Sequence, residues 1–318
     1  MLVSVVIPAY NSEAFLEKTL QSVFSQTFRD FEVICIDDGS TDSTPQVIRK
    51  HGQSVRYVYQ TNRGAAVARN RGIGMARGEF LAFLDADDRW LPDKLARQVR
   101  YLQENRDVAM VHSNVCVIDS RDSITKPCLP ISERHRGFQI FTELYLGNFI
   151  ATPSSVMVRR SCLDAVGNFD ETMRCCEDFD LWLRIAANCK IGYQDVVMVK
   201  YRMHETNVSN DKMAMNITVK RVIDGIKVKY PEKVSSIPTE KMRKRVFDLN
   251  RWIGLGYFRQ YDLASARKHF LGALKCRRTS IPLYIYLLST FFGKDIIGMI
   301  RNVKKRRNSH RKGTVELA

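Results

Sequence analysis

The stretch Glu79-Phe-Leu-Ala-Phe-Leu-Asp85-Ala-Asp-Asp88 places a short apolar run directly before three carboxylates. An apolar run of this length bounded by polar residues predicts a buried strand over residues 79–84. Carboxylates crowded at a strand end repel one another unless a cation lies among them, and Mg²⁺ or Mn²⁺ prefers carboxylate oxygens together with phosphate oxygens. The stretch therefore predicts a strand that ends at a metal site. A solvated acidic turn that caps the next helix is the alternative.

Two further apolar runs, residues 2–7 and 31–36, show the same pattern upstream. Helical segments, among them 12–25 and 64–76, separate the predicted strands, and this alternation predicts a mostly parallel sheet covered by helices on both faces. In such sheets, ligands bind outside the carboxyl ends of the strands. We therefore expect three polar clusters to meet at one edge of the sheet: Pro8–Asn11, Asp37–Asp42 and Asp85–Asp88.

Length, composition and charge define the broad class of the protein. With 318 residues, 45% of them apolar, the chain has room for about two domains, and disordered, collagen-like and coiled-coil proteins are excluded. Residues 1–211 carry 25 Lys and Arg against 27 Asp and Glu, whereas residues 212–318 carry 25 against 7. This asymmetry predicts one domain over 1–211 and a basic, helical region over 212–318. It argues against a chain that binds nucleic acid along its whole length.

The cysteines and the N-terminus indicate where the protein works. None of the eight cysteines belongs to a Cys-x-x-Cys pair or to a Cys/His spacing that suits zinc. Reduced thiols in the cytoplasm are therefore expected. The first residues have no basic segment and too short an apolar run for a signal peptide, and no apolar window is long enough to span a membrane.

Two glycine-containing segments test other nucleotide-binding classes. The segment Gly72–Gly78 has the wrong spacing for a dinucleotide fingerprint and precedes a strand instead of following one. A P-loop lysine motif is also missing from the sequence, so an ordinary dehydrogenase or NTPase is excluded. In the second segment, Asp37–Ser40, a carboxylate could accept from a nucleobase N–H while Gly39 allows close backbone approach. A plain Asp/Gly turn before a helix is the alternative.

Four motifs stand in a fixed order along the first part of the chain: Val3–Asn11, Val33–Asp42, Asn62–Asn70 and Gly78–Asp88. Their order and spacing resemble the family-2 inverting glycosyltransferases of the GT-A fold, over about residues 3–210. The resemblance implies an α/β fold with a mixed, mostly parallel sheet flanked by helices. The all-helical C-terminal region lies outside it.

The resemblance also implies roles for particular residues. The nucleotide-sugar would be bound by Pro8, Ala9, Tyr10, Asn11, Asp38, Arg69, Asp85 and Ala86. Asp38 is at the position that hydrogen-bonds uracil, which favours a UDP-sugar. Asp87 is at the position of the direct ligand to Mn²⁺ or Mg²⁺, which bridges the diphosphate and offsets the charge on the leaving UDP. His204, in Tyr-Arg-Met-His, is at a position that can reach the metal; a purely structural histidine is the alternative.

The same likeness continues at Glu177-Asp178-Phe-Asp180, where Asp178 matches the family's general base. An acceptor hydroxyl must lose its proton while it attacks the anomeric carbon from the face opposite UDP. One carboxylate suffices for this single inverting displacement, unlike the pair used by retaining glycosidases. The alternative is an acidic residue placed by the dipole of the helix predicted over 178–188. Cys175-Cys176 and Phe179 depart from the family pattern near the acceptor side.

The resemblance therefore implies a metal-dependent inverting glycosyltransferase of the hexosyl or N-acetylhexosaminyl type. The acceptor would be a hydroxyl of a saccharide or lipid-linked saccharide in surface polysaccharide biosynthesis. A nucleotidyltransferase is one rival, but it usually carries a Gly-rich basic loop where Pro8–Asn11 stands. A catalytically inactive helical-repeat scaffold is the other rival. Four intact aspartates argue against it: Asp38, Asp85, Asp87 and Asp178.

The basic region 212–318 leaves three uses open. Residues 253–275 resemble one tetratricopeptide-type unit, but such arrays need about three repeats, so a plain helical hairpin is favoured. The region could pack on the catalytic domain. It could instead bind an anionic membrane surface through residues 281–312, because apolar 281–292 is followed by basic 301–307. Such a protein would be peripheral on the inner face of the membrane. Nucleic-acid binding is the third use, and no motif supports it.

Overall fold

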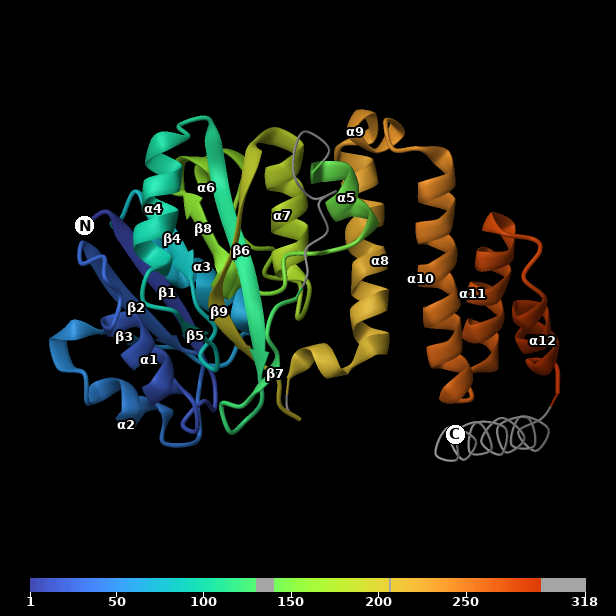
Figure 1. Ribbon diagram of the computed structural model, residues 1–318. Coiled ribbons are helices and arrows are strands. Elements are labelled where there is room, and N and C mark those ends of the chain that lie inside the picture. The colour runs from blue at the N-terminus through green and yellow to red at the C-terminus, as the bar shows by residue number, and fades with distance from the viewer. Residues whose placement is uncertain (130–139, 206, 293–318) are drawn as a thin grey trace, which may run out of the picture. The chain divides into compact units, whose positions relative to one another are not determined.

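The computed structural model describes residues 1–129, 140–205 and 207–292 (Figure 1). The chain divides into two compact units, Met1–Asn210 with Arg221–Ser236, and Asp211–Lys220 with Ile237–Ala318. Helix α8 (Lys212–Lys229) contributes residues to both units. The domain boundary expected after residue 211 therefore stays a prediction.

Nine strands within the described residues form one mixed sheet in the first unit, in the order β3-β2-β1-β4-β8-β6-β9-β5, with β7 beside β6. The strands are β1 (Val3–Ala9), β2 (Phe31–Asp37), β3 (Arg56–Tyr59), β4 (Phe80–Phe83), β5 (Arg89–Trp90), β6 (Val108–Ile118), β7 (Ile124–Lys126), β8 (Val156–Arg159) and β9 (Lys190–Arg202). Strands β3, β2, β1 and β4 run parallel, as do β6 and β9, whereas β8 is antiparallel to both of its neighbours. The predicted fold class, a mixed and mostly parallel sheet flanked by helices, is confirmed.

Helices cover both faces of this sheet (Figure 1). Those of the first unit are α1 (Leu16–Phe24), α2 (Thr44–Arg49), α3 (Ala65–Met75), α4 (Lys94–Glu104), α5 (Ile140–Leu146), α6 (Arg160–Val166), α7 (Glu177–Asn188), the second half of α8 and α9 (Pro231–Ser235). Alternate residues of β1 explain the two layers. Val3, Val5 and Ile7 share a core with residues of α1 and α4. Val6 faces α3 so closely that a Cβ at Gly72 would lie 2.4 Å from its Cγ1.

Register brings the ends of three central strands to one edge. Ala9 at the end of β1 pairs with Asp37 at the end of β2, and Val6 pairs with Phe83 at the end of β4. The main chain continues this alignment, because Asp38 N–H donates to the Ala9 carbonyl at 2.7 Å. The three polar clusters expected at this edge therefore begin side by side.

One predicted helix has different limits in the structure. The helix expected over 12–25 begins at Leu16, because Asn11 adopts a left-handed conformation with φ 46° and Ser12 N–H donates to Thr44 Oγ1. These contacts tie the start of the segment to the loop after β2. Strand β6 is long and continuous, and it pairs with β9 along its length through local register shifts.

The second unit is built from helices α10 (Thr239–Arg259), α11 (Leu263–Cys276) and α12 (Ile281–Ser289), with the first half of α8. Its core contains Phe247, Phe258, Phe270 and Leu283. Helices α10 and α11 pack so closely that a Cβ at Gly254 would meet the Phe270 ring at 2.6 Å. A helical hairpin is therefore present where one was expected. The basic segment 301–312 lies outside the described residues. Among the described helices, none has the length and apolar character needed to cross a bilayer.

Candidate active site

Asp38, which is expected to bind the nucleotide, directly follows the carboxyl end of β2. Its Oδ1 accepts hydrogen bonds from Gln60 Nε2 at 2.7 Å and Arg63 N–H at 2.9 Å, and its Oδ2 accepts from Gly64 N–H at 2.8 Å. The side chain is buried. A carboxylate has about four acceptor positions, so Asp38 can still accept one further N–H, such as that of a nucleobase.

The residues after β1 close the same end of the sheet. Tyr10 is 51% exposed, whereas Ala9 is buried and Pro8 is half-buried. Asn11 links two loops, since its N–H donates to Ser40 Oγ at 3.0 Å and its Oδ1 accepts from Thr41 N–H at 2.8 Å. Four residues here are expected to bind the nucleotide-sugar: Pro8, Ala9, Tyr10 and Asn11. Among them, Tyr10 presents an exposed aromatic ring, and Asn11 fixes the loop that contains Tyr10.

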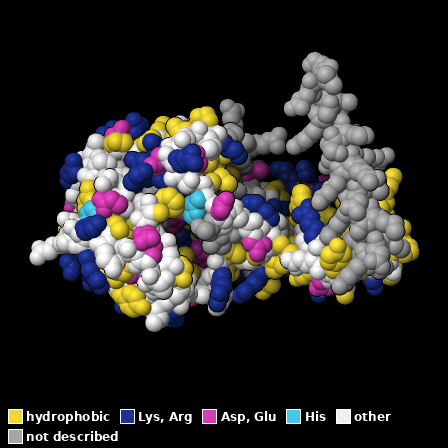
Figure 2. All heavy atoms as spheres, turned by 90° about the horizontal axis from the view of Figure 1, so that it is seen from below, with side chains coloured by type: hydrophobic (Ala, Val, Ile, Leu, Met, Phe, Trp, Pro, Cys, Tyr) yellow, Lys and Arg dark blue, Asp and Glu magenta, His cyan; other side chains and the backbone are white. Residues whose placement is uncertain are grey.

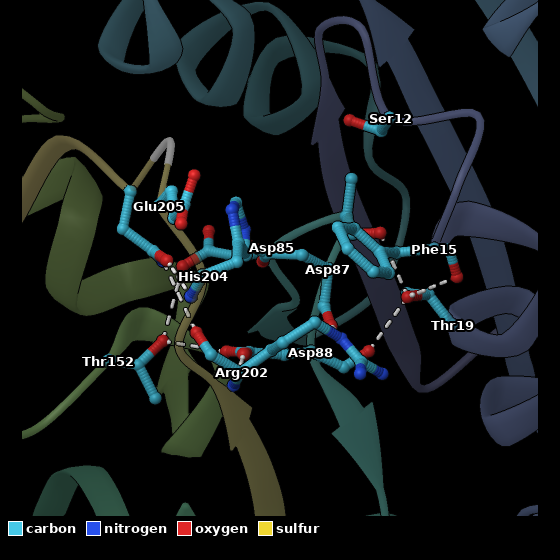
Figure 3. A network of polar contacts seen from close by, with 12 residues as sticks. Ser12, Phe15, Thr19, Asp85, Asp87, Asp88, Thr152, Arg202, His204 and Glu205 are labelled. Carbon is cyan, nitrogen blue, oxygen red and sulfur yellow. Dashed lines mark hydrogen bonds and ion pairs between the residues drawn. The ribbon is translucent and has the colours of Figure 1, made fainter. Parts of the chain in front are cut away.

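The acidic loop after β4 places its three carboxylates in three different surroundings (Figure 3). Asp88 is fully buried, and it accepts from Ser154 Oγ at 2.6 Å, Thr152 Oγ1 at 3.1 Å and Arg202 N–H at 2.9 Å. Burial, followed by the charges of the two neighbouring aspartates, raises the pKa of Asp88 well above its usual value. Asp88 therefore holds the loop from its buried side and is not available to contact a substrate.

Asp87 and His204 lie close together on the open side of this loop (Figure 3). Asp87 Oδ2 is 2.9 Å from His204 Nε2, and the imidazole lies beside the Phe15 ring with centroids 5.1 Å apart. The Arg202 guanidinium donates to the Asp87 carbonyl at 2.8 Å and so holds the main chain of the loop. Arg202 is buried. Both side chains are thus held with their ligand atoms aimed at one place.

The donor set of Asp87 and His204 fits a divalent ion. A carboxylate oxygen and an imidazole nitrogen are both accepted by Mn²⁺, and the carboxylate also suits Mg²⁺. No three His, Cys, Asp or Glu side chains in the described part of the chain are grouped to hold a metal. An ion at this place would therefore need further ligands from the substrate, which the oxygens of a diphosphate can supply.

Arg69 joins the acidic loop to the start of helix α7. Its Nη2 lies 2.6 Å from Asp85 Oδ1, and its Nη1 lies 2.6 Å from Glu177 Oε1. The guanidinium is buried over the Phe169 ring at 5.4 Å, and its pKa is raised because the two carboxylates outweigh the cost of burial. Predicted as a nucleotide-binding residue, Arg69 lies between two carboxylates that occupy both of its amino groups.

Asp178 follows Glu177 in the first turn of α7 and is half-buried. Its Oδ1 accepts from Phe179 N–H at 2.8 Å. Burial and the adjacent charge of Glu177 raise the pKa of Asp178 to about 7, against the opposing effect of Arg69. A carboxylate poised near neutral pH is suited to accept a proton during a reaction.

Cys176 precedes this pair in a left-handed conformation with φ 60°. A residue with a Cβ is disfavoured there by roughly 1–2 kcal/mol, and the sharp turn it makes places the Glu177–Asp178 pair at the helix start. Burial raises the pKa of the Cys176 thiol. Cys176 therefore acts on the site through the backbone and not as a nucleophile.

The structure brings most of the predicted site residues to one edge of the sheet. Asp85 and Asp87 lie on one loop, and Arg69 connects that loop to the helix turn of Asp178. Tyr10 and Asp38 directly follow the ends of the neighbouring strands β1 and β2. Ala86 is buried, and its carbonyl accepts from Thr19 Oγ1 at 2.9 Å. Sequence reasoning missed three partners of Asp88: Thr152, Ser154 and Arg202. Two segments carried a signal for them: Thr152-Pro153-Ser154, a hydroxyl pair around a proline, and Arg202 within Tyr-Arg-Met-His.

Comparison with known proteins identifies the family. Residues 4–167, more than half of the chain, match the model of glycosyl transferase family 2. The chain belongs to that family. An uncharacterised glycosyltransferase of Rickettsia typhi is 28% identical over 214 residues, which cover 66% of this family-2 chain and 66% of the relative. A putative teichuronic acid biosynthesis glycosyltransferase, TuaG of Bacillus subtilis, is 41% identical over 107 residues, 32% of this chain and 42% of that protein.

Solved structures support the same fold for this family-2 protein. The Staphylococcus aureus protein TarS, residues 1–349 in complex with UDP, matches with a TM-score of 0.61 and 20% identity over 91% of both chains. A mannosyltransferase from Pyrobaculum calidifontis, in complex with GDP-Man and Mn²⁺, matches with a TM-score of 0.60 and 19% identity over 90% of this chain and 78% of that one. At these identities the likeness establishes the fold alone, and the predicted GT-A fold is confirmed.

Proposed function

We propose that this family-2 glycosyltransferase moves a sugar from a nucleoside-diphosphate donor to a saccharide hydroxyl with inversion, and that Asp178 is its general base. The observation that carries the proposal is the position of Arg69, whose two amino groups bond Asp85 and Glu177. One guanidinium thereby links the acids of the donor side to the helix turn that presents Asp178. A donor and a base are needed on opposite sides of one anomeric carbon, and this link sets their separation.

The donor is proposed to be a UDP-hexose or UDP-N-acetylhexosamine. Asp38 keeps one acceptor position for a base N–H, and Tyr10 offers an exposed ring beside it. Structures of TarS have been solved with UDP and with UDP-GlcNAc, whereas the Pyrobaculum mannosyltransferase was solved with GDP-Man. A base-selective test must therefore compare uridine with guanosine donors.

The proposed reaction is a single displacement. Asp178, as carboxylate, accepts the proton of the acceptor hydroxyl while the hydroxyl oxygen bonds to the anomeric carbon. The bond from that carbon to the diphosphate oxygen breaks in the same step, and the bonding electrons leave with the nucleoside diphosphate. Attack from the opposite face inverts the anomeric centre, so a second catalytic carboxylate is not required.

Asp87 and His204 would hold Mn²⁺ or Mg²⁺. When bound there, the ion offsets the negative charge that grows on the diphosphate leaving group. Two neighbouring residues hold these side chains in position: Arg202 bonds the main chain of Asp87, and the Phe15 ring packs against the imidazole of His204. Asp85 accepts from Arg69 Nη2 at 2.6 Å and from Thr152 Oγ1 at 3.1 Å, and we propose that it lies on the side of the ribose and the donor sugar.

The acceptor is proposed to be a saccharide or lipid-linked saccharide, and the product class a surface polysaccharide. TuaG, named for teichuronic acid biosynthesis, supports this class. We also propose that the protein acts in the cytoplasm, at the inner face of the membrane. A nucleotidyltransferase, the rival enzyme, would release pyrophosphate instead of a nucleoside diphosphate.

A donor panel tests the proposal. Purified protein is incubated with Mn²⁺, UDP-sugars, GDP-sugars and oligosaccharide acceptors, and the released nucleotide and the anomeric configuration of the product are read by chromatography and NMR. We expect UDP release, an inverted product and loss of turnover with a chelator. Asp87→Asn should lose turnover as well, whereas the exposed Asp164→Asn is the matched control. Pyrophosphate release, or a retained configuration, would overturn the proposal.

A further inference from the structure

Helix α12 turns an apolar stripe toward solvent. The stripe consists of Ile281, Tyr284, Ile285 and Leu288 and continues beyond the helix with Phe291 and Phe292. The exposed fraction of the four helical side chains runs from 42% for Tyr284 to 72% for Ile281. Spacings of three and four residues place them on one face of the helix. Contiguous exposed apolar surface of this kind marks an interaction site in soluble proteins.

The stripe is not the side of α12 that holds the second unit together. Leu283 is buried in the core formed with α10 and α11, and Tyr286 and Leu287 pack against that core. Tyr286 contacts the Phe258 ring edge-on, with centroids 5.5 Å apart. The helix is therefore apolar on two sides, and folding of the unit uses one of them.

Cations lie at both ends of the stripe. Residues 237–292 contain eleven Lys and Arg and three Asp and Glu. Exposed Arg277 and Arg278 stand directly before α12, and the Arg267 guanidinium lies 3.9 Å from the centre of the Phe291 ring. Figure 2 shows hydrophobic side chains beside Lys and Arg side chains on the surface of this unit. The combination is an apolar strip with a positive border.

We infer that the α12 stripe docks on an anionic lipid surface, with its apolar side chains in the boundary between headgroups and acyl chains and Arg277 and Arg278 on the headgroup phosphates. A helix of nine residues cannot span a bilayer, but a helix with an apolar face and a cationic border lies in its surface. A second copy of the chain would bring two positive borders together, so charge disfavours it as the occupant. This inference does not depend on the proposed transfer reaction.

Vesicle co-sedimentation of the full chain tests the inference. We expect the protein to bind vesicles of phosphatidylcholine with phosphatidylglycerol, and to bind phosphatidylcholine vesicles much more weakly. Added salt should reduce the binding, because headgroup attraction is screened. The double variant Ile285→Ser/Leu288→Ser should lose about tenfold or more in partition, since two buried side chains no longer contribute.

Two further variants separate the contributions. Arg277→Gln/Arg278→Gln should weaken binding to anionic vesicles and flatten its salt dependence. Val228→Ser, which changes an exposed valine on α8 in the same way, is the control and should bind as the unaltered protein does. Circular dichroism and thermal melting confirm that each variant is folded.

Three results would overturn the inference. The first is a folded chain that does not bind anionic vesicles. The second is vesicle binding that the α12 variants leave unchanged, which would assign it to residues 293–318 or to another surface. The third is a dimer, seen by light scattering, that the Ile285→Ser/Leu288→Ser variant separates into monomers without vesicle binding; the stripe would then join two copies of the chain.

Discussion

The acidic loop after β4 and the first turn of α7 both hold carboxylates close together, and the protein stabilises the two clusters in similar ways. Each brings carboxylates together, and in each some carboxylates are bound tightly by the protein: Asp88 by three hydrogen-bond donors, and Asp85 and Glu177 by Arg69. One further member of each cluster, Asp87 or Asp178, faces the site. Firmly partnered acids thus shape the site, and their neighbours are available for substrate chemistry.

The two clusters differ in how many elements support them. The loop after β4 is held by hydroxyls of the segment before β8 and by the main chain and side chain of β9. At the start of α7, Glu177 is bound by one guanidinium, that of Arg69. Loss of a single contact should therefore be tolerated better in the loop than in the helix turn, and the following experiments test this difference.

Replacement of Asp178 should have the largest effect. Asp178→Asn keeps the size of the side chain but removes the group that accepts the acceptor proton, so turnover should fall by about 10²–10⁴-fold. Donor binding, measured by calorimetry with UDP, should stay unchanged. Asp164→Asn carries the same chemical change on the exposed face of α6 and should keep full turnover. Full transfer by Asp178→Asn would place the base elsewhere.

Replacement of Arg69 should have the next largest effect. Three charged groups act on Asp178: Glu177 and Asp85 raise its pKa, and Arg69 lowers it. In the unaltered protein, kcat/KM should fall below about pH 7, because protonated Asp178 cannot accept a proton. Arg69→Met should move this decline to higher pH and reduce kcat by about 10- to 100-fold, since Asp178 is also displaced.

A conservative variant separates the charge of Arg69 from its shape. Arg69→Lys keeps a cation but cannot bond both carboxylates through a planar fork, so its pH profile should resemble that of the unaltered protein while kcat stays low. Arg77→Met, an exposed residue beyond the far end of α3, is the matched control. An Arg69→Met profile identical to that of the unaltered protein would show that the guanidinium does not act on Asp178.

Much of the fold and part of the candidate site could be predicted from the sequence. Apolar runs bounded by acidic residues predicted the central strands, and the resemblance implied that the acidic loop and the Glu177–Asp178 pair belong to one site. The sequence did not predict the hydrogen bond between Ser154 and Asp88. These residues lie 66 positions apart, and their contact depends on how β8 packs beside β4. The bridging position of Arg69 was missed for the same reason, since Glu177 lies 108 positions away.

Replacement of Asp88 should have the smallest effect on catalysis and a clear effect on stability. Asp88→Ala leaves the buried donors Ser154 Oγ and Arg202 N–H without their acceptor, which should lower the free energy of unfolding by about 2 kcal/mol. For a unit of this size, that change corresponds to a fall in Tm of about 4–8 °C. Asp88→Asn keeps an acceptor oxygen and should lose less.

Calorimetric melting and turnover, measured on the same Asp88 samples, decide whether the two clusters follow one rule. We expect Asp88→Ala to melt earlier and, well below its Tm, to retain turnover within a few-fold of the unaltered protein. Asp164→Ala is the control for removing an exposed carboxylate. An Asp88→Ala protein that melts normally but has lost turnover would contradict the comparison, because a fully partnered acid would then belong to the chemistry and not to its support.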